Sequence, residues 1–502
     1  MKIGGAFGLN FTSLAWCAGF LLMSLMASHW VSIDSDLVIH ILYGRAVLDG
    51  GLPQVDPLLS GVTEAPVLQE WLFEVVVAWL DRHLGLMGPL LLASLLMGTL
   101  MAGLFARMRK QGVCLWIALV YVIFVLITLR IHLIIRPHLV SWAAIVVLMA
   151  WLEAWQAGRK PFVSTLWQGA LLMLLWSNLH GGFLIGLALT GVFALDRGYR
   201  FARGMAGEQF LQAVALVVVY LLASFVNPWG WGLHQHLLAF LNNDFLLGST
   251  TDFLPPIFAN GSLWVLSVAG VATVLPLLAR WRQVTLRDWL LLAGLGYAAA
   301  TSARNIPFFG LILLSVAAGY LESWLELPGN RFGRLVLESS GRLEEDQGTR
   351  SGIGWPLLIV ASSLLLLFSG TIRVGLHSQN VPEAAMDWIN THPELYSAPV
   401  FADYMFAGYL LYRTPVTKVY LHALNANYPD QRLKNYFAVE KEEADWEATL
   451  DGLSWAVVRA GEGHAETFMT SPCWQPVYSD EMADVFQRYC FNPQQSQSSA
   501  DF

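Results

Sequence analysis

Long apolar runs constrain the fold of this 502-residue chain more than any other feature. A helix needs about 20 mainly apolar residues to cross a bilayer. Eleven stretches approach that length, near residues 9–28, 86–106, 113–130, 137–157, 162–178, 181–197, 208–226, 260–279, 287–303, 305–325 and 355–375. Because 56% of the residues are hydrophobic and only 13% are charged, a water-soluble fold could not bury so much apolar surface. The sequence therefore predicts a polytopic α-helical membrane protein with about eleven spans.

Basic residues near the ends of these runs predict the orientation, because such residues favour the cytoplasm. The first run, read as a retained anchor, follows Lys2. Five further basic groups should share the side of Lys2: Arg107/Arg109/Lys110, Arg159/Lys160, Arg197/Arg200/Arg203, Arg280/Arg282/Arg287 and Arg331/Arg334/Arg342. They do so only if the shorter apolar stretch 67–80 does not cross. We therefore expect an interfacial helix near 67–83 on the outer side and a cytoplasmic N-terminus.

The composition changes after the last apolar run. Residues 377–490 alternate helical patterns, at 382–391 and 442–450, with strand-like runs that begin at Pro399, Lys418, Trp455 and Gln475. We expect a small soluble α/β domain here, on the outer side, after a membrane domain of residues 1–376 and before a disordered tail, 491–502. Cys473 and Cys490 are expected to pair in that oxidising compartment. His422 and His464 have no partner pattern and are predicted to lie on the surface.

The remaining polar clusters should gather on the outer side, in loop 31–66 and at 130–138, 178–182, 227–252 and 304–305. Asp36 opens a helical pattern that runs to Leu48, with Ser35 or Asp34 as its cap and Gly50-Gly51 as its end. Charged groups at membrane depth are costly and are seldom kept without a partner or a task. We therefore expect a cavity on this face that carries both acids and bases.

Several motifs follow one another in a distinctive order. An N-terminal span precedes the loop acid Asp36, and Glu64-Ala-Pro-Val-Leu-Gln-Glu70-Trp-Leu precedes the second outer helix. Later motifs are Arg136-Pro-His-Leu, Trp176-Ser-Asn-Leu-His-Gly-Gly-Phe, Asn227-Pro-Trp-Gly, Arg304-Asn-Ile-Pro-Phe-Phe and Val400-Phe-Ala-Asp-Tyr-Met-Phe-Ala-Gly-Tyr-Leu. Over about residues 30–488 this order resembles the type C glycosyltransferase superfamily (GT-C), which includes protein O-mannosyltransferases and lipid A aminoarabinose transferases, and within it a bacterial branch. The chain lacks the Lys-Pro or His-Pro-Pro of the better-known members.

The resemblance implies an inverting enzyme of the bacterial inner membrane, with its C-terminal domain in the periplasm. Such an enzyme moves a sugar from a polyprenyl-phosphate-type lipid to a lipid, glycan or protein acceptor on the outer face. It makes Asp36 the base that deprotonates the acceptor, with Asp34 in reserve. It assigns the other site residues to two roles: donor-phosphate binding by Arg136, His138, His180 and Arg304, and acceptor-side acids Asp56, Glu64 and Glu70. For each cation, a snorkelling or hydrogen-bonded contact at a helix end is the alternative interpretation.

Other classes of function stay open from the sequence. A polytopic transporter or lipid flippase also gathers charge at membrane depth, although here the clusters lie at one face and no inverted repeat is evident. A non-catalytic assembly subunit with the same fold is a third reading. Asp36, Asp56, Glu64 and Glu70 offer oxygen ligands to a divalent metal, but no spacing fixes a site and no cofactor is assigned. The net charge of −8 gives no reason to expect a nucleic-acid partner.

Overall fold

The computed structural model describes residues 7–8, 10–30, 35–205, 207–258, 261–347, 352–369, 381–395, 398–414, 418–443 and 445–490. Asp34 and the tail 491–502 lie outside the described residues. The chain forms two compact units, one of Met1–Ser28 with Met87–Arg373 and one of His29–Leu86 with Val374–Phe502. The sequence analysis had grouped loop 31–66 and the helix near 67–83 with the membrane domain. In the structure these segments form one unit with the C-terminal residues.

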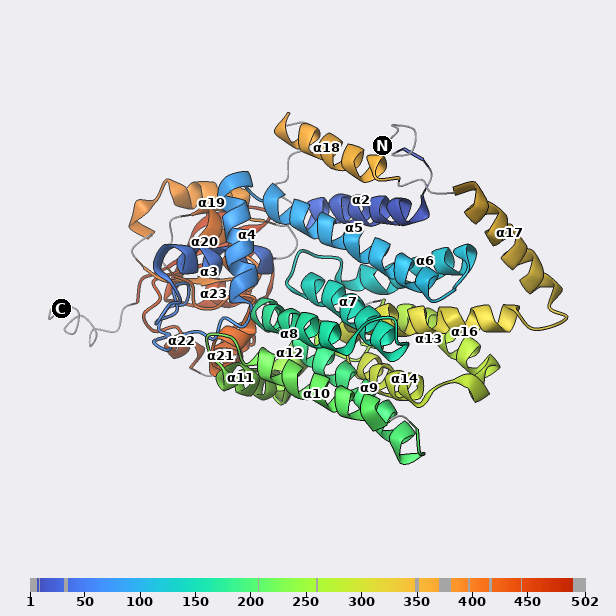
Figure 1. The fold of residues 1–502 in the computed structure, drawn as a ribbon. Coiled ribbons are helices and arrows are strands. Elements are labelled where there is room, and N and C mark those ends of the chain that lie inside the picture. The colour runs from blue at the N-terminus through green and yellow to red at the C-terminus, as the bar shows by residue number, and fades with distance from the viewer. Residues whose placement is uncertain are drawn as a thin grey trace. The chain divides into compact units, whose positions relative to one another are not determined.

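The first unit is helical (Figure 1). Its α-helices are α2 Phe11–Trp30, α5 Met87–Lys110, α6 Leu115–Leu129, α7 His138–Gln156, α8 Phe162–Leu179, α9 Phe183–Ala202, α10 Gly207–Ser224, α11 Trp231–Leu241, α12 Asp244–Ser249, α13 Ser262–Ala279, α14 Leu286–Thr301, α15 Ile306–Phe309, α16 Ser315–Leu325, α17 Arg331–Gln347 and α18 Gly354–Phe368. A helix lies in each of the eleven predicted apolar runs, because such runs can satisfy their backbone hydrogen bonds internally only as helices.

Seven helical segments of the described chain are long and apolar enough to cross a membrane: Met87–Lys110, Leu115–His132, His138–Gln156, Phe162–Leu179, Gly207–Ser224, Ser262–Ala279 and Ala303–Leu325. Two shorter apolar helices, Phe11–Leu25 and Gly354–Leu366, coincide with the first and last predicted spans. The architecture fits a polytopic helical protein. Polar contacts join neighbouring helices. Ser24 Oγ donates to Ser94 Oγ between α2 and α5 (2.9 Å), and Tyr220 OH donates to the Thr165 carbonyl between α10 and α8 (2.8 Å).

The second unit combines helices with one four-stranded sheet. Its helices are α3 Asp36–Gly50, α4 Trp71–Leu84, α19 Glu383–Asn390, α20 Ala407–Arg413, α21 Asp430–Glu440, α22 Trp446–Thr449 and α23 Gly463–Thr470. The strands β1 Val400–Ala402, β2 Trp455–Arg459, β3 Trp474–Ser479 and β4 Ala483–Arg488 have the order β1-β2-β4-β3, with β1 parallel to β2 and the other pairs antiparallel. This confirms α/β character for the C-terminal residues.

Several local predictions for this unit need correction. The run at Lys418 forms no strand, because only Val419 pairs, in isolated bridges with Leu59 and Val400. The pattern at 442–450 shortens to α22, and β4 was not anticipated. The predicted helix at Asp36 is present and ends at Gly51, where φ is +80°. The Ser35 side chain makes no capping hydrogen bond to the described part of α3.

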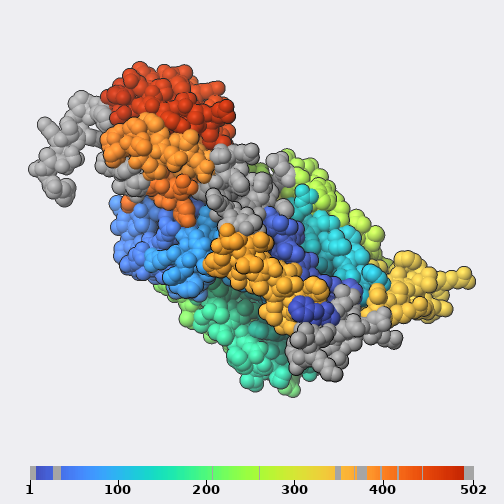
Figure 2. Space-filling model, turned by 90° about the horizontal axis from the view of Figure 1, so that it is seen from above, coloured from blue at the N-terminus to red at the C-terminus, as the bar shows by residue number. Residues whose placement is uncertain are grey.

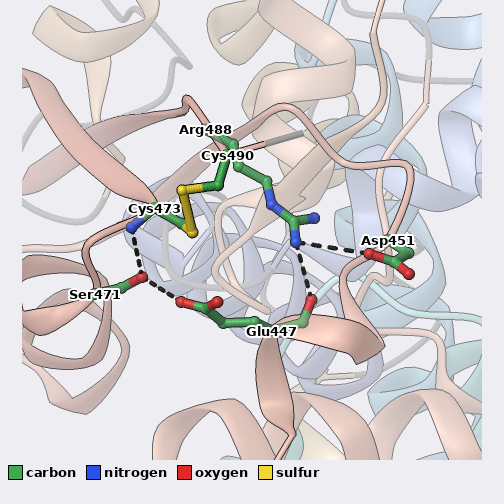
Figure 3. Close-up of a disulfide and its surroundings, with 6 residues drawn as sticks. All are labelled: Glu447, Asp451, Ser471, Cys473, Arg488 and Cys490. Carbon is green, nitrogen blue, oxygen red and sulfur yellow. Dashed lines mark hydrogen bonds and ion pairs between the residues drawn. A yellow bond between two sulfur atoms is a disulfide. The ribbon is translucent and has the colours of Figure 1, made fainter. Parts of the chain in front are cut away.

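Cys473 and Cys490 form a disulfide, which is the pairing expected from the sequence (Figure 3). The bond joins the start of β3 to the end of β4, which already lie side by side in the sheet. Around it, the Cys473 amide donates to Ser471 Oγ (3.1 Å), and Ser471 in turn donates to Glu447. The Arg488 guanidinium lies 3.6 Å from Asp451. The disulfide therefore closes the edge of a sheet that is also held to α22 by polar contacts.

Candidate functional site

A pocket in the first unit is lined by side chains from four separate stretches of the chain. They are His132, Arg136, His138, Trp142, His180, Asp252, Arg304 and Phe308. All four residues that the sequence analysis assigned to phosphate binding are among them. The structure adds His132 and Asp252, which belong to polar segments singled out from the sequence but had no partner pattern there.

The lining residues meet because of where they stand on their helices. His132 follows the C-terminal end of α6, and His138 begins α7. His180 follows the last residue of α8, and Arg304 lies in a short 3-10 turn, Ala303–Asn305, that opens the segment leading to α16. Successive helices run in opposite directions, so these positions share one set of helix ends.

The opposite end of α7 carries a different polar contact. There the buried Glu153 accepts two hydrogen bonds from Arg107 (2.6 and 2.8 Å).

Asp252 is the carboxylate of the pocket. It lies in a 3-10 turn, Thr251–Phe253, that is held to the Arg304 turn by two hydrogen bonds, from Ser302 Oγ to the Asp252 carbonyl (3.3 Å) and from the Ala303 amide to the Leu254 carbonyl (3.0 Å). Its Oδ2 lies 3.7 Å from His132 Nδ1 and 4.0 Å from an Arg136 guanidinium nitrogen. The described lining thus combines two arginines and three histidines with a single acid, which favours an anionic ligand.

The hydrogen bonds around His180 define its protonation. Trp176 Nε1 donates to Ser141 Oγ (2.6 Å), so the Ser141 hydroxyl proton is directed to His180 Nδ1 (2.6 Å). The Gly182 amide also donates to this nitrogen (3.0 Å). Because Nδ1 accepts two hydrogen bonds, the neutral ring carries its proton on Nε2 and is a donor there. A Cβ atom at Gly182 would lie 2.3 Å from Ser141 Oγ, so this position requires glycine.

Aromatic rings orient the other basic side chains. His138 Nε2 donates to the His132 carbonyl (2.9 Å), and its ring packs against Trp142 with centroids 4.7 Å apart. The Arg304 guanidinium lies over the Phe253 ring, 4.7 Å from its centroid. Such contacts hold a cation in place and leave its N–H groups directed outward around the ring edge. The pocket is therefore a preformed arrangement of donors.

The expected acids lie in the second unit, within or close to α3 and α4. Asp36 is buried in the first turn of α3. One turn further, the buried His40 has Nδ1 3.2 Å from Glu74 Oε1 and Nε2 3.6 Å from Glu70 Oε2. Burial raises the pKa of Glu74 well above its usual value. The helices cross closely at Gly44, where a Cβ would lie 2.0 Å from the Glu74 carbonyl oxygen.

Asp56 is engaged in holding its own loop. Its Oδ1 accepts from the Leu58 and Leu59 amides (2.8 and 2.9 Å), and its Oδ2 accepts from Tyr43 OH (2.8 Å). With three donors on two oxygens, this buried carboxylate fixes the turn after α3. Glu64 is exposed. These contacts favour a structural role for Asp56 and leave Glu64 open to solvent.

His422 and His464 are buried, so the prediction that they lie on the surface was wrong. The Leu424 amide donates to His422 Nδ1 (3.2 Å), and His422 Nε2 donates to the Tyr43 hydroxyl oxygen (2.9 Å). Burial lowers the pKa of His422 to about 3. His464 Nε2 donates to the Tyr436 carbonyl (3.0 Å). Both rings are therefore buried with hydrogen-bond partners: for both nitrogens of His422 and for Nε2 of His464.

Within the part of the chain that the structure describes, no group of three or more His, Cys, Asp or Glu side chains is placed to hold a metal ion. Comparison with models of known protein families gives no match, and comparison with curated proteins gives none. The functional interpretation therefore depends on the chemistry of the pocket and of the buried acids.

Proposed function

We propose that this chain is an integral-membrane glycosyltransferase of the GT-C type. It moves a sugar from a polyprenyl-phosphate-type donor to an acceptor on the outer, periplasmic face of the bacterial inner membrane. One observation carries the proposal: Arg136, His138, His180 and Arg304, distant in sequence, line one pocket at a shared set of helix ends. A pocket with this excess of donors over acids suits a phosphate group.

In the proposed reaction the acceptor hydroxyl or amine attacks the anomeric carbon while the bond from that carbon to the phosphate oxygen breaks. The electron pair of that bond leaves with the lipid phosphate, whose negative charge grows in the transition state. Arg136 and Arg304 stabilise this charge through ionic hydrogen bonds, and His180 adds a neutral donor through Nε2. Preoriented donors help most, because they need not reorganise during the reaction.

The proton released by the acceptor goes to Asp36. A carboxylate is suited to this role when it lies within hydrogen-bond reach of the attacking group. Asp36 stands in the first turn of a well-packed helix, which limits its movement. Asp34 remains the reserve candidate, and Glu64 and Glu70 remain candidates on the acceptor side.

Two measurements test this function. Binding of a polyprenyl phosphate to the protein in lipid nanodiscs should weaken by about 10- to 150-fold in Arg136→Gln, the equivalent of losing one charged hydrogen bond. Arg130→Gln is the matched control, because Arg130 is exposed near the same helix end and does not line the pocket. Equal binding by both variants would count against a phosphate site.

Asp36→Asn separates an enzyme from the alternatives. The enzyme should keep its affinity for the donor lipid and lose sugar transfer, because only the base is removed. A lipid flippase would instead move labelled lipid between leaflets without a change in its glycan. A non-catalytic assembly subunit would show no loss in cellular glycan when Asp36 is replaced.

A further inference from the structure

Helix α17, Arg331–Gln347, has three distinct faces along its length. At 3.6 residues per turn, Gly333, Leu337, Ser340 and Glu344 share one face. This face is docked on neighbouring helices of the first unit: the Leu115 amide donates to Ser340 Oγ (2.7 Å), and Glu344 pairs with Arg109 (2.6 Å). Ser340 is only 1% exposed. The helix is therefore fixed in rotation, and the surroundings of its other two faces are determined.

The second face is apolar and uncovered. Phe332, Val336 and Leu343 recur at helical spacing along it, and Leu335 stands at its border with the charged residues. Phe332 and Leu335 are 67% and 66% exposed, whereas Val336 and Leu343 are half-buried. Trp116, 40% exposed, extends this surface and donates from Nε1 to Ser339 Oγ (3.1 Å). Two large apolar side chains that are about two-thirds exposed on one helix are costly in water.

The third face is charged, with Arg331, Arg334, Glu338 and Arg342 in sequence. The docked face contacts neighbouring helices of the first unit. Around the helix, the apolar face therefore lies between those neighbouring helices and the charged face. A helix in water would need only an apolar stripe toward its own core. An exposed apolar stripe away from the docked face, bordered by arginines, is the pattern of a helix that lies in a lipid headgroup region.

The contacts of α17 place it at the level where spans end. Leu115 is the first residue of the candidate span Leu115–His132, and Arg109 lies in the last turn of Met87–Lys110. The preceding helix α16 ends at Leu325, six residues before α17 begins. His132, in the pocket, is at the other end of the span that begins at Leu115. The helix projects from the edge of its unit (Figure 1), and the space-filling view shows this segment, coloured yellow to gold, as a protrusion (Figure 2).

We propose that α17 is a lipid-binding helix that lies in the membrane interface at the helix ends opposite the pocket. Its apolar face inserts between acyl chains, and Arg331, Arg334 and Arg342 contact the phosphates of anionic lipids. Charge complementarity favours anionic lipid over a neutral bilayer, because cationic side chains near a surface are attracted to negative headgroups. This proposal is independent of the proposed enzymatic activity.

The test is nitroxide labelling of the full-length protein at Leu335→Cys, with Phe332→Cys as a second apolar site and Gly341→Cys as the matched control. Gly341 is exposed, has room for a side chain, and lies about 120° and 180° around the helix from positions 335 and 332. All variants carry Cys17→Ala and Cys114→Ala, and the nanodiscs contain phosphatidylethanolamine with phosphatidylglycerol. Labels at 335 and 332 should collide with oxygen at least several-fold more than with a water-soluble nickel chelate, whereas the label at 341 should show the reverse preference.

Three other outcomes overturn the proposal. Equal access of nickel to positions 335 and 341 would mean that the apolar face is in water. Exclusion of both reagents from position 335 would mean that a protein, such as a second copy of the chain, covers the face. If replacing phosphatidylglycerol by phosphatidylcholine leaves the label at 335 unchanged in depth, and Arg331→Gln with Arg334→Gln also has no effect, the anionic-lipid contact is refuted.

Discussion

Protonation of His422 should make the second unit unstable in mild acid. The ring is buried, with the Leu424 amide donating to Nδ1 and with Nε2 donating to Tyr43, which in turn donates to Asp56. A proton on Nδ1 would make this nitrogen a donor that faces a second donor, the Leu424 amide. Burial therefore lowers the pKa of His422 to about 3, whereas an unfolded histidine titrates near 6.5.

The direction of this pH dependence follows from the number of protons that the folded and unfolded chains bind. Below about pH 6.5 the unfolded chain takes up a proton at His422 that the folded chain does not, so stability is complete above that pH and falls progressively toward pH 3. From pH 7 to pH 5 the loss is about 2 kcal/mol, at 1.36 kcal/mol per unit of pKa. Glu74, whose folded pKa is raised by burial, acts in the opposite direction. The comparison must therefore be with a variant that changes His422 alone.

The assay is hydrogen exchange of the full-length protein in detergent, corrected for the intrinsic effect of pH and followed in β2, Trp455–Arg459. Wild type should lose about 2 kcal/mol of protection between pH 7 and pH 5. In His422→Gln, which keeps a side-chain N–H donor, this loss should largely disappear even if the variant is less stable at pH 7. Parallel pH profiles for the two proteins would refute the assignment of His422 as a buried neutral group.

Three further predictions concern covalent and polar contacts. Replacing Cys473 and Cys490 by serine opens a loop of 17 residues and should destabilise the second unit by about 3 kcal/mol, measured as faster proteolysis without reductant. Ser141→Ala leaves His180 Nδ1 and the Trp176 N–H with fewer partners; it should weaken polyprenyl-phosphate binding by about tenfold, and unchanged affinity would argue against the relay. Asp252→Asn removes the acid of the pocket and should tighten binding of the same lipid several-fold, whereas weaker binding would make Asp252 a ligand contact.

Much of the helical framework follows from local sequence, and its reason is physical. An apolar run of span length has one way to satisfy its backbone in lipid, so each predicted run coincides with a helix. The start of α3 at Asp36 and its end at Gly51 were equally local, because the end needs a positive φ that glycine accepts readily. The strand β1 and the disulfide also followed from short patterns.

The long-range contacts could not be read from such patterns. Tyr43 and His422 are 379 residues apart, and nothing near His422 in sequence indicates a partner in α3. The same limit explains why loop 31–66 was grouped with the membrane domain. In the pocket, Arg136 and Arg304 were found because each stands at a helix end, whereas Asp252 was missed because a short turn between helices has no periodicity.

The most direct test of the central claim is a structure of the protein in nanodiscs with a polyprenyl phosphate. The account predicts that the phosphate lies in the pocket of the first unit, with its oxygens within hydrogen-bond distance, about 3 Å, of the Arg136 and Arg304 guanidinium groups. His180 Nε2 should face the same phosphate. A lipid phosphate bound elsewhere on the protein, with these three side chains in contact with no part of it, would contradict the account.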